Sequence, residues 1–132
     1  MSNVRGLYIA LISVHGLIRG TNPELGRDAD TGGQVQYVLD LARALSERPD
    51  VDRVELMTRQ ILSTNVGTQY GEPIEQIADK AWIVRLPCGP HRYLHKETLW
   101  PYLPQFTDEA LQHFRRIRRV PDVVHSHYAD AG

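Results

Sequence analysis

The chain of 132 residues has a single cysteine, Cys88, and a formal net charge of only -1. One cysteine excludes a disulfide framework within the chain and is typical of a reducing compartment such as the cytoplasm. The balanced charge gives no reason to expect nucleic acid or an anionic membrane as a partner. The apolar run Leu7–Val14 is too short to span a bilayer, and no signal-peptide cleavage site follows it.

Motifs that bind metal are also lacking. Two histidine pairs, His91 with His95 and His125 with His127, suggest zinc ligands at first sight. Neither pair stands in a Cys-x-x-Cys or His-Glu-x-x-His pattern. The His-x-His spacing suits a strand whose alternate side chains point to the same side. We therefore expect neither a metal site nor a bound cofactor.

What the sequence does contain is an alternation of short apolar runs and amphipathic segments. Four strands are expected, at 7–14, 54–58, 81–86 and 123–126. Helices are expected at 34–48 and 107–119, with a short helix at 96–103 that Pro101 and Pro104 interrupt, and 60–80 is expected to be mostly loop. This order predicts an α/β fold in one domain, a doubly wound, Rossmann-like parallel sheet with flanking helices.

The two long helices carry recognisable buried stripes. The first stripe is expected to contain Val35, Val38, Leu41, Ala42 and Leu45. The second helix is expected to be capped by Thr107, to end before Pro121, and to bury Ala110, Leu111, Phe114 and Ile117. Ligands of doubly wound sheets bind where the strands end. His15, Arg59, Cys88 and His127 all follow predicted strands, so a small-molecule site is expected at that edge.

The polar turn 26–34, Gly-Arg-Asp-Ala-Asp-Thr-Gly-Gly-Gln, joins the first strand to the first helix. Gly32 and Gly33 at a helix N-terminus can present backbone N–H groups to a phosphate, or can simply form a tight turn. Gln34 can contact the ligand or complete a capping box with Thr31. This turn favours a phosphorylated ligand but leaves both interpretations open.

Two further residues have a functional and an ordinary interpretation. His15 can face a ligand at the end of the first strand, or bond to the backbone of its own loop. Lys96 can be a solvated side chain, or can form a phosphate pocket with Arg92.

Several sequence blocks, taken together, closely resemble the start of the glucosyltransferase domain of the sucrose-phosphate synthase family. They include Ser-Val-His-Gly-Leu-Ile-Arg-Gly, Glu-Leu-Gly-Arg-Asp-Ala-Asp-Thr-Gly-Gly-Gln-Val and Lys-Glu-Thr-Leu-Trp-Pro-Tyr-Leu-Pro, at 13–20, 24–35 and 96–104. Shorter blocks lie at 58–61, 70–73, 86–90 and 127–132. Sucrose synthase shares the His-Gly and Asp-Thr-Gly-Gly-Gln-Val blocks but is less similar at Arg-Gln-Ile, Pro-Cys-Gly-Pro and Ala-Asp-Ala-Gly.

The resemblance implies a retaining glycosyltransferase of the two-lobed GT-B type. Such enzymes transfer glucose from UDP-glucose, a co-substrate, to fructose 6-phosphate, giving sucrose 6-phosphate and UDP. The resemblance also implies the substrate-binding positions: His15 lining the cleft, Gly32 and Gly33 offering N–H groups, Gln34 bonding sugar oxygens, Lys96 pairing with the 6-phosphate, and Tyr128 contacting the acceptor. It assigns no catalytic residue to this chain.

Residues 1–132 are thus expected to be a truncated acceptor-side lobe that needs the second lobe of the same protein and is inactive alone. Two departures from the family pattern are Ser126, between the two histidines, and the pair His91-Arg92, which leaves Arg92 in doubt as a ligand. Sucrose synthase, with fructose as acceptor, remains an alternative. A non-catalytic sugar-phosphate-binding or interaction module is another.

Overall fold

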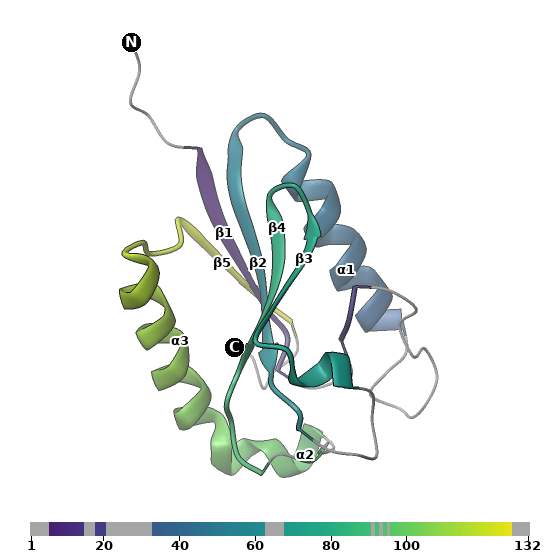
Figure 1. Ribbon diagram of the computed structural model, residues 1–132, viewed down its shortest axis with the longest axis vertical. Coiled ribbons are helices and arrows are strands. Elements are labelled where there is room, and N and C mark those ends of the chain that lie inside the picture. Colours follow the sequence, from purple (N-terminus) through teal and green to yellow (C-terminus); the bar gives the residue numbers. More distant parts are fainter. Residues whose placement is uncertain are drawn as a thin grey trace.

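A computed structural model describes residues 6–14, 18–20, 33–62, 68–90, 92, 94 and 96–127, with the backbone alone described at 33, 34, 68, 69, 96 and 97. A five-stranded sheet carries helices on its faces (Figure 1). The strands are β1 (Leu7–Ile12), β2 (Val51–Arg59), β3 (Ile74–Ala78), β4 (Ala81–Leu86) and β5 (Val123–Ser126). The helices are α1 (Gly33–Ser46), α2 (Lys96–Leu99) and α3 (Leu103–Ile117), with 3₁₀ turns η1 (Thr68–Gly71) and η2 (Trp100–Tyr102). The predicted α/β class is confirmed.

The strand order is β3-β4-β2-β1-β5. β1 pairs in parallel with β2 and β5, and β2 pairs in parallel with β4, as predicted. β3 was expected to be loop, and that prediction is wrong, because it pairs antiparallel with β4. The physical reason is the short link Asp79-Lys80, which is long enough only for a hairpin and therefore returns the chain beside the strand it has just left.

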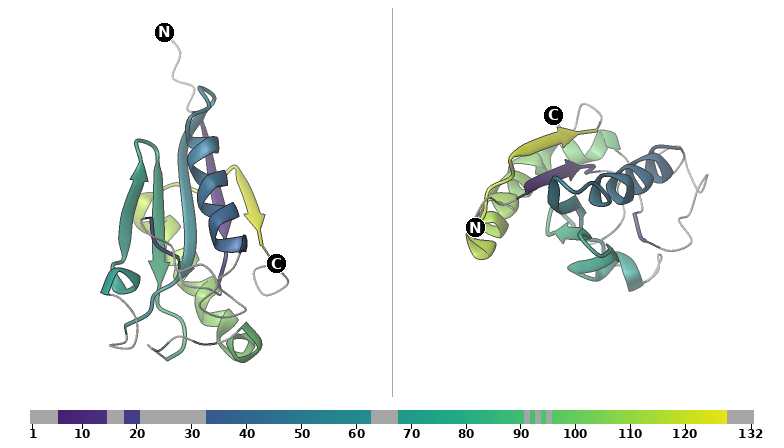
Figure 2. Two further views of the ribbon diagram at one scale, coloured as in Figure 1. Left: turned by 90° about the vertical axis from the view of Figure 1, so that its right-hand side faces the viewer. Right: turned by 90° about the horizontal axis from the view of Figure 1, so that it is seen from above.

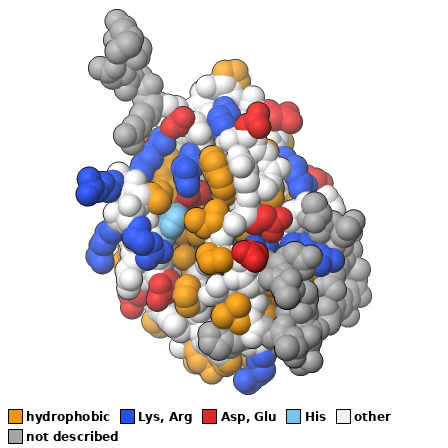
Figure 3. Space-filling view, in the orientation of Figure 1, with side chains coloured by type: hydrophobic (Ala, Val, Ile, Leu, Met, Phe, Trp, Pro, Cys, Tyr) orange, Lys and Arg blue, Asp and Glu red, His pale blue; other side chains and the backbone are white. Residues whose placement is uncertain are grey.

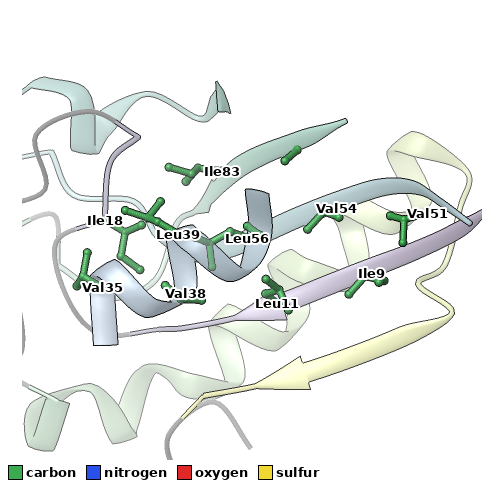
Figure 4. Close-up of a cluster of buried hydrophobic side chains, with 12 residues drawn as sticks. Ile9, Leu11, Ile18, Val35, Val38, Leu39, Val51, Val54, Leu56 and Ile83 are labelled. Atoms are coloured by element: carbon green, nitrogen blue, oxygen red, sulfur yellow. The ribbon is translucent and has the colours of Figure 1, made fainter. Parts of the chain in front are cut away.

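One face of the sheet is covered by α1. Val35, Val38 and Ala42 are at most 1% exposed, so the predicted stripe is confirmed. Figure 4 shows side chains of α1 lying over those of β1, β2 and β4, including Leu11, Leu56 and Ile83. Burial of this apolar surface, at about 25 cal/mol per Å², holds α1 against the sheet.

The opposite face is covered by α3 (Figure 2). Phe106 and Ala110 of this helix belong to a second buried cluster with Ala10, Val14 and Leu86. Two helices on opposite faces confirm the doubly wound arrangement.

The boundaries and stripe of α3 differ from the prediction. The helix begins at Leu103 rather than after Thr107, because Pro104 lies in the first turn, where a missing N–H costs no hydrogen bond. Thr107 is not a cap, since its Oγ1 donates to the carbonyl of Leu103 at 3.2 Å within the helix. The helix ends at Ile117, before Pro121, as predicted. The next residue, Arg118, caps it in the left-handed conformation with a φ of 57°.

The predicted buried residue Leu111 is 46% exposed, whereas His113 is buried at 3%. The helical register is responsible, because Phe106, Ala110 and His113 share the face that meets the sheet. No helix among the described residues is long and apolar enough to cross a membrane.

Candidate functional site

The four parallel strands end at one edge of the sheet, and their backbone pairing continues past the strand ends. Ser13 donates to the carbonyl of Met57 at 3.0 Å, and His127 donates to the carbonyl of Ile12 at 2.9 Å. Gln60 likewise donates to the carbonyl of Leu86 at 2.9 Å. Of the four residues expected at this edge, Arg59, Cys88 and His127 therefore lie there, and His15 lies outside the described residues.

The structure describes three of the six predicted substrate-binding residues, Gly33, Gln34 and Lys96. Gly33 is the first residue of α1 and Gln34 follows it, so their N–H groups are in the first turn of this helix, where they have no partner within the helix itself. Lys96 is the first residue of α2. His15, Gly32 and Tyr128 lie outside the described residues, as does Thr31 of the predicted capping box. The binding roles of all six stay predictions.

Arg59 is the last residue of β2 and is only 3% exposed. Its guanidinium Nη1 donates to the carbonyls of Cys88 at 3.2 Å and Pro90 at 2.6 Å. Its Nη2 donates to the carbonyl of Arg92. A buried cation thus holds the turn that follows β4 and leads to α2.

Cys88 lies on this turn and is buried. Its Sγ lies 3.2 Å from the carbonyl oxygen of Tyr102, to which it donates. Burial raises the pKa of the Cys88 thiol, against a smaller lowering by the charge of Arg59. Because only the thiolate is strongly nucleophilic, Cys88 packs the turn and is not a reactive group.

His127, just beyond β5, offers an unpaired polar atom. Its ring stacks on His125 at 4.7 Å between centroids and meets the edge of Tyr37 at 5.8 Å. Burial and the neighbouring His125 lower the pKa of His127, so its ring is neutral at pH 7. Its Nε2 is buried and has no hydrogen-bond partner among the residues that the structure describes. The shared side of both histidines is what the His-x-His spacing predicts.

Sequence reasoning missed Tyr37, which is 56% exposed on α1. Its position three residues after Gln34 was the available signal, because residues three apart in a helix lie on one face. The side chain of Tyr37 therefore extends the edge that begins at the N-terminus of α1.

A second missed feature anchors the segment Ile18–Gly20. The guanidinium of Arg85 donates to the carbonyl of Ile18 at 2.9 Å and pairs with Glu75 at 2.7 Å. Glu75 in turn accepts from the backbone N–H of Gly20 at 2.9 Å. Arg43 of α1 donates to the carbonyl of Gly20. The first loop is thereby tied to β3, β4 and α1.

A hydrophobic groove lies between α3 and the strands β1 and β5. Its lining residues are Ile12, Val14, Leu103, Phe106, Thr107, Ala110, Leu111, Phe114 and Val124. Figure 3 shows hydrophobic side chains in the middle of the face seen in Figure 1, with basic side chains to their left. A sugar phosphate needs cations and N–H donors, which this lining does not supply. Val124 of β5 is 56% exposed.

Among the residues that the structure describes, no group of three or more His, Cys, Asp or Glu side chains could hold a metal ion. The polar groups described at the edge include backbone N–H groups, the guanidinium of Arg59, the ring of His127 and the hydroxyl of Tyr37. These groups suit a ligand rich in oxygen atoms.

Comparison with known proteins gives consistent relatives. The family model described as the sucrose synthase first GT-B domain matches residues 2–132. The sucrose-phosphate synthase of Zea mays is 51% identical over 96% of this chain and 14% of its own length. Sucrose-phosphate synthase 4 of Arabidopsis thaliana is 50% identical over 97% of this chain and 14% of its own.

A solved sucrose-phosphate synthase from Thermosynechococcus elongatus superposes with a TM-score of 0.75 and 26% identity. The match covers 95% of this chain and 28% of that one. The chain therefore spans a small part of each relative's own length.

Proposed function

This chain belongs to the family of the sucrose synthase first GT-B domain, and on that premise we propose that it is the acceptor-binding lobe of a sucrose-phosphate synthase. The reaction is transfer of glucose, with retention, from UDP-glucose to fructose 6-phosphate, giving sucrose 6-phosphate and UDP. The observation that carries this proposal is the identity of 51% with the Zea mays sucrose-phosphate synthase over 96% of the chain.

The proposed acceptor site lies at the carboxyl edge of the sheet. A phosphate dianion needs a cation and N–H donors, and Lys96 and the first turn of α1 supply them. Gly32 and Gly33 offer N–H groups, and Gln34 bonds sugar oxygens. His15 and Tyr128 complete the site around the sugar.

The proposed enzyme needs a second lobe, which binds UDP-glucose and stabilises the leaving UDP. The chain alone therefore transfers no glucose. We assign it no metal and no cofactor, since UDP-glucose is a co-substrate. The lone, buried Cys88 supports a cytoplasmic location.

The main alternative is sucrose synthase, with fructose as acceptor, because the matching family model is described by that activity. A chimera separates the two: the segment of the Zea mays enzyme that aligns with this chain is replaced by this chain. We expect transfer from UDP-glucose to fructose 6-phosphate and little to fructose. Equal use of both sugars would favour sucrose synthase. A folded but inactive chimera would favour a non-catalytic binding module.

A further inference from the structure

We infer that Arg59 is a positioning residue for phosphate recognition, acting through the turn that leads from β4 to Lys96. This inference rests on the proposed function, because it assumes that Lys96 pairs with the acceptor phosphate. Arg59 itself is not placed against the ligand. Its guanidinium, buried at the end of β2, donates to three backbone carbonyls of the turn at Cys88, Pro90 and Arg92.

Those three bonds determine the path of the turn. A guanidinium is planar and presents several N–H donors in fixed directions, so carbonyls bonded to it are held relative to one another. A lysine ammonium is a single point donor on a flexible stem. It cannot reach the same set of carbonyls from the end of β2 with the same geometry.

The turn is also held from the side of α3. Gly89 has a φ of +66°, and a Cβ at this position would lie 2.7 Å from Cγ of Tyr102. Its backbone N–H donates to Oε1 of Gln105 at 2.7 Å. The turn is thus enclosed between β2 and the start of α3, and only glycine fits there without strain.

Lys96 lies four residues beyond Arg92, on a segment that is itself anchored. Leu94 before it and Leu99 after it are both buried in the cluster beneath α3. Leu94, which lies between Arg92 and Lys96 in the sequence, is thus fixed against the core, as is Leu99 of the helix that Lys96 begins. A charge-assisted hydrogen bond to phosphate is short, typically about 2.7–2.9 Å. After a shift of the local backbone, the flexible stem of Lys96 must give up more conformational freedom to restore that length, and the interaction weakens.

The test measures dissociation constants for fructose 6-phosphate and fructose with the whole 132-residue chain, by titration followed in NMR spectra. The variants are Arg59→Lys, Lys96→Ala, their combination, and Gly89→Ala as an independent disturbance of the same turn. Tyr8→Phe is the control, because it removes a buried hydrogen bond from Tyr8 to Glu55, outside this turn. Urea unfolding of each variant shows whether it is folded.

We expect the wild type to prefer fructose 6-phosphate over fructose, and Arg59→Lys to reduce that preference roughly tenfold, the factor for one lost hydrogen bond to a charged group. Gly89→Ala acts in the same direction, and Tyr8→Phe leaves the preference unchanged. In the Lys96→Ala background, Arg59→Lys has no further effect on the preference, because both act on one interaction.

The outcomes distinguish the two claims. If the wild type shows no preference, the proposed function fails and the inference fails with it. If Lys96→Ala abolishes the preference but Arg59→Lys and Gly89→Ala keep it, the function stands and the inference is wrong. Equal weakening of both sugars by Arg59→Lys, or a further loss of preference on top of Lys96→Ala, also overturns the positioning role.

Discussion

His113 Nε2 on α3 lies 2.9 Å from Glu55 Oε1 on β2, with both side chains buried. An ionised carboxylate only accepts hydrogen bonds, so the histidine ring donates here. The hydroxyl of Tyr8 also donates to Glu55, and Arg53 pairs with the second oxygen at 2.6 Å. Burial alone would raise the pKa of Glu55, but the hydrogen bonds from His113, Tyr8 and Arg53 outweigh it and lower the pKa.

Replacement of this carboxylate is expected to be strongly destabilising. Glu55→Leu leaves the polar atoms of Tyr8 and His113 buried without their hydrogen-bond acceptor. We expect the free energy of unfolding to fall by about 3–5 kcal/mol. Tyr8→Phe removes one donor while His113 and Arg53 remain, and should cost about 1–2 kcal/mol. Urea unfolding monitored by circular dichroism measures both. If Glu55→Leu were as stable as the wild type, the network would not hold α3 to the sheet.

The lowered pKa of His127 makes stability depend on pH. Because the folded-state pKa lies below the unfolded value of about 6.5, the unfolded chain takes up the proton first. The stabilisation is complete above that value and is lost as the pH falls towards the folded-state pKa. His127→Gln should therefore flatten the decline in stability between about pH 7 and pH 5. His125→Gln should flatten this decline only in part, because the charge of His125 is the smaller of the two causes of the lowered pKa of His127. An unchanged slope for His127→Gln would contradict the buried, neutral ring.

The anchor of the first loop is tested by Gly20→Ala. A Cβ at Gly20 would lie 2.6 Å from both Glu75 Oε2 and Ile77 Cγ2, so the contact with Glu75 must shift. We expect a loss of about 1–3 kcal/mol, the range for overpacking. Glu75→Gln removes the charge that pairs with buried Arg85 and leaves one acceptor oxygen where Glu75 uses two, so it should also be destabilising. Equal stability of Gly20→Ala and wild type, by thermal unfolding, would show that this segment is not anchored as described.

Cys88 is expected to be unreactive in the folded chain. Its buried thiol has a raised pKa, so little thiolate forms at pH 8. A thiol-specific reagent such as DTNB should label the native chain slowly and the urea-unfolded chain within its mixing time. Rapid labelling of the native chain would mean that the turn around Cys88 opens readily, which would contradict the packing by Arg59 and Tyr102.

The strands and both long helices could be predicted because their apolar periodicity is strong, as in the stripe of Val35, Val38 and Ala42. The strand β3 does not follow from the sequence of Ile74–Ala78. It lies at the edge of the sheet, and its residues are exposed or only partly buried, so they lack the continuous apolar run of a central strand. The sequence pattern predicts the start of α3 too late, because proline disrupts the interior of a helix but is compatible with its first turn, where Pro104 lies.

The candidate site was predictable to a smaller extent. The clustering of Arg59, Cys88 and His127 follows from the topology of parallel strands, which the sequence pattern indicates. The partners of Arg59 and Arg85 do not follow from any local pattern, because they depend on distant backbone carbonyls brought close by the fold. His113 was similarly missed, since its partner Glu55 lies on another element.

The central claim is that this chain binds a phosphorylated sugar at the carboxyl edge of its sheet through Lys96. The most direct test is a calorimetric titration of the wild type and of Lys96→Ala with fructose 6-phosphate and then with fructose. We expect the wild type to bind fructose 6-phosphate more tightly than fructose, and the variant to lose that difference. Equal binding of both sugars by the wild type, unaffected by Lys96→Ala, would contradict the claim.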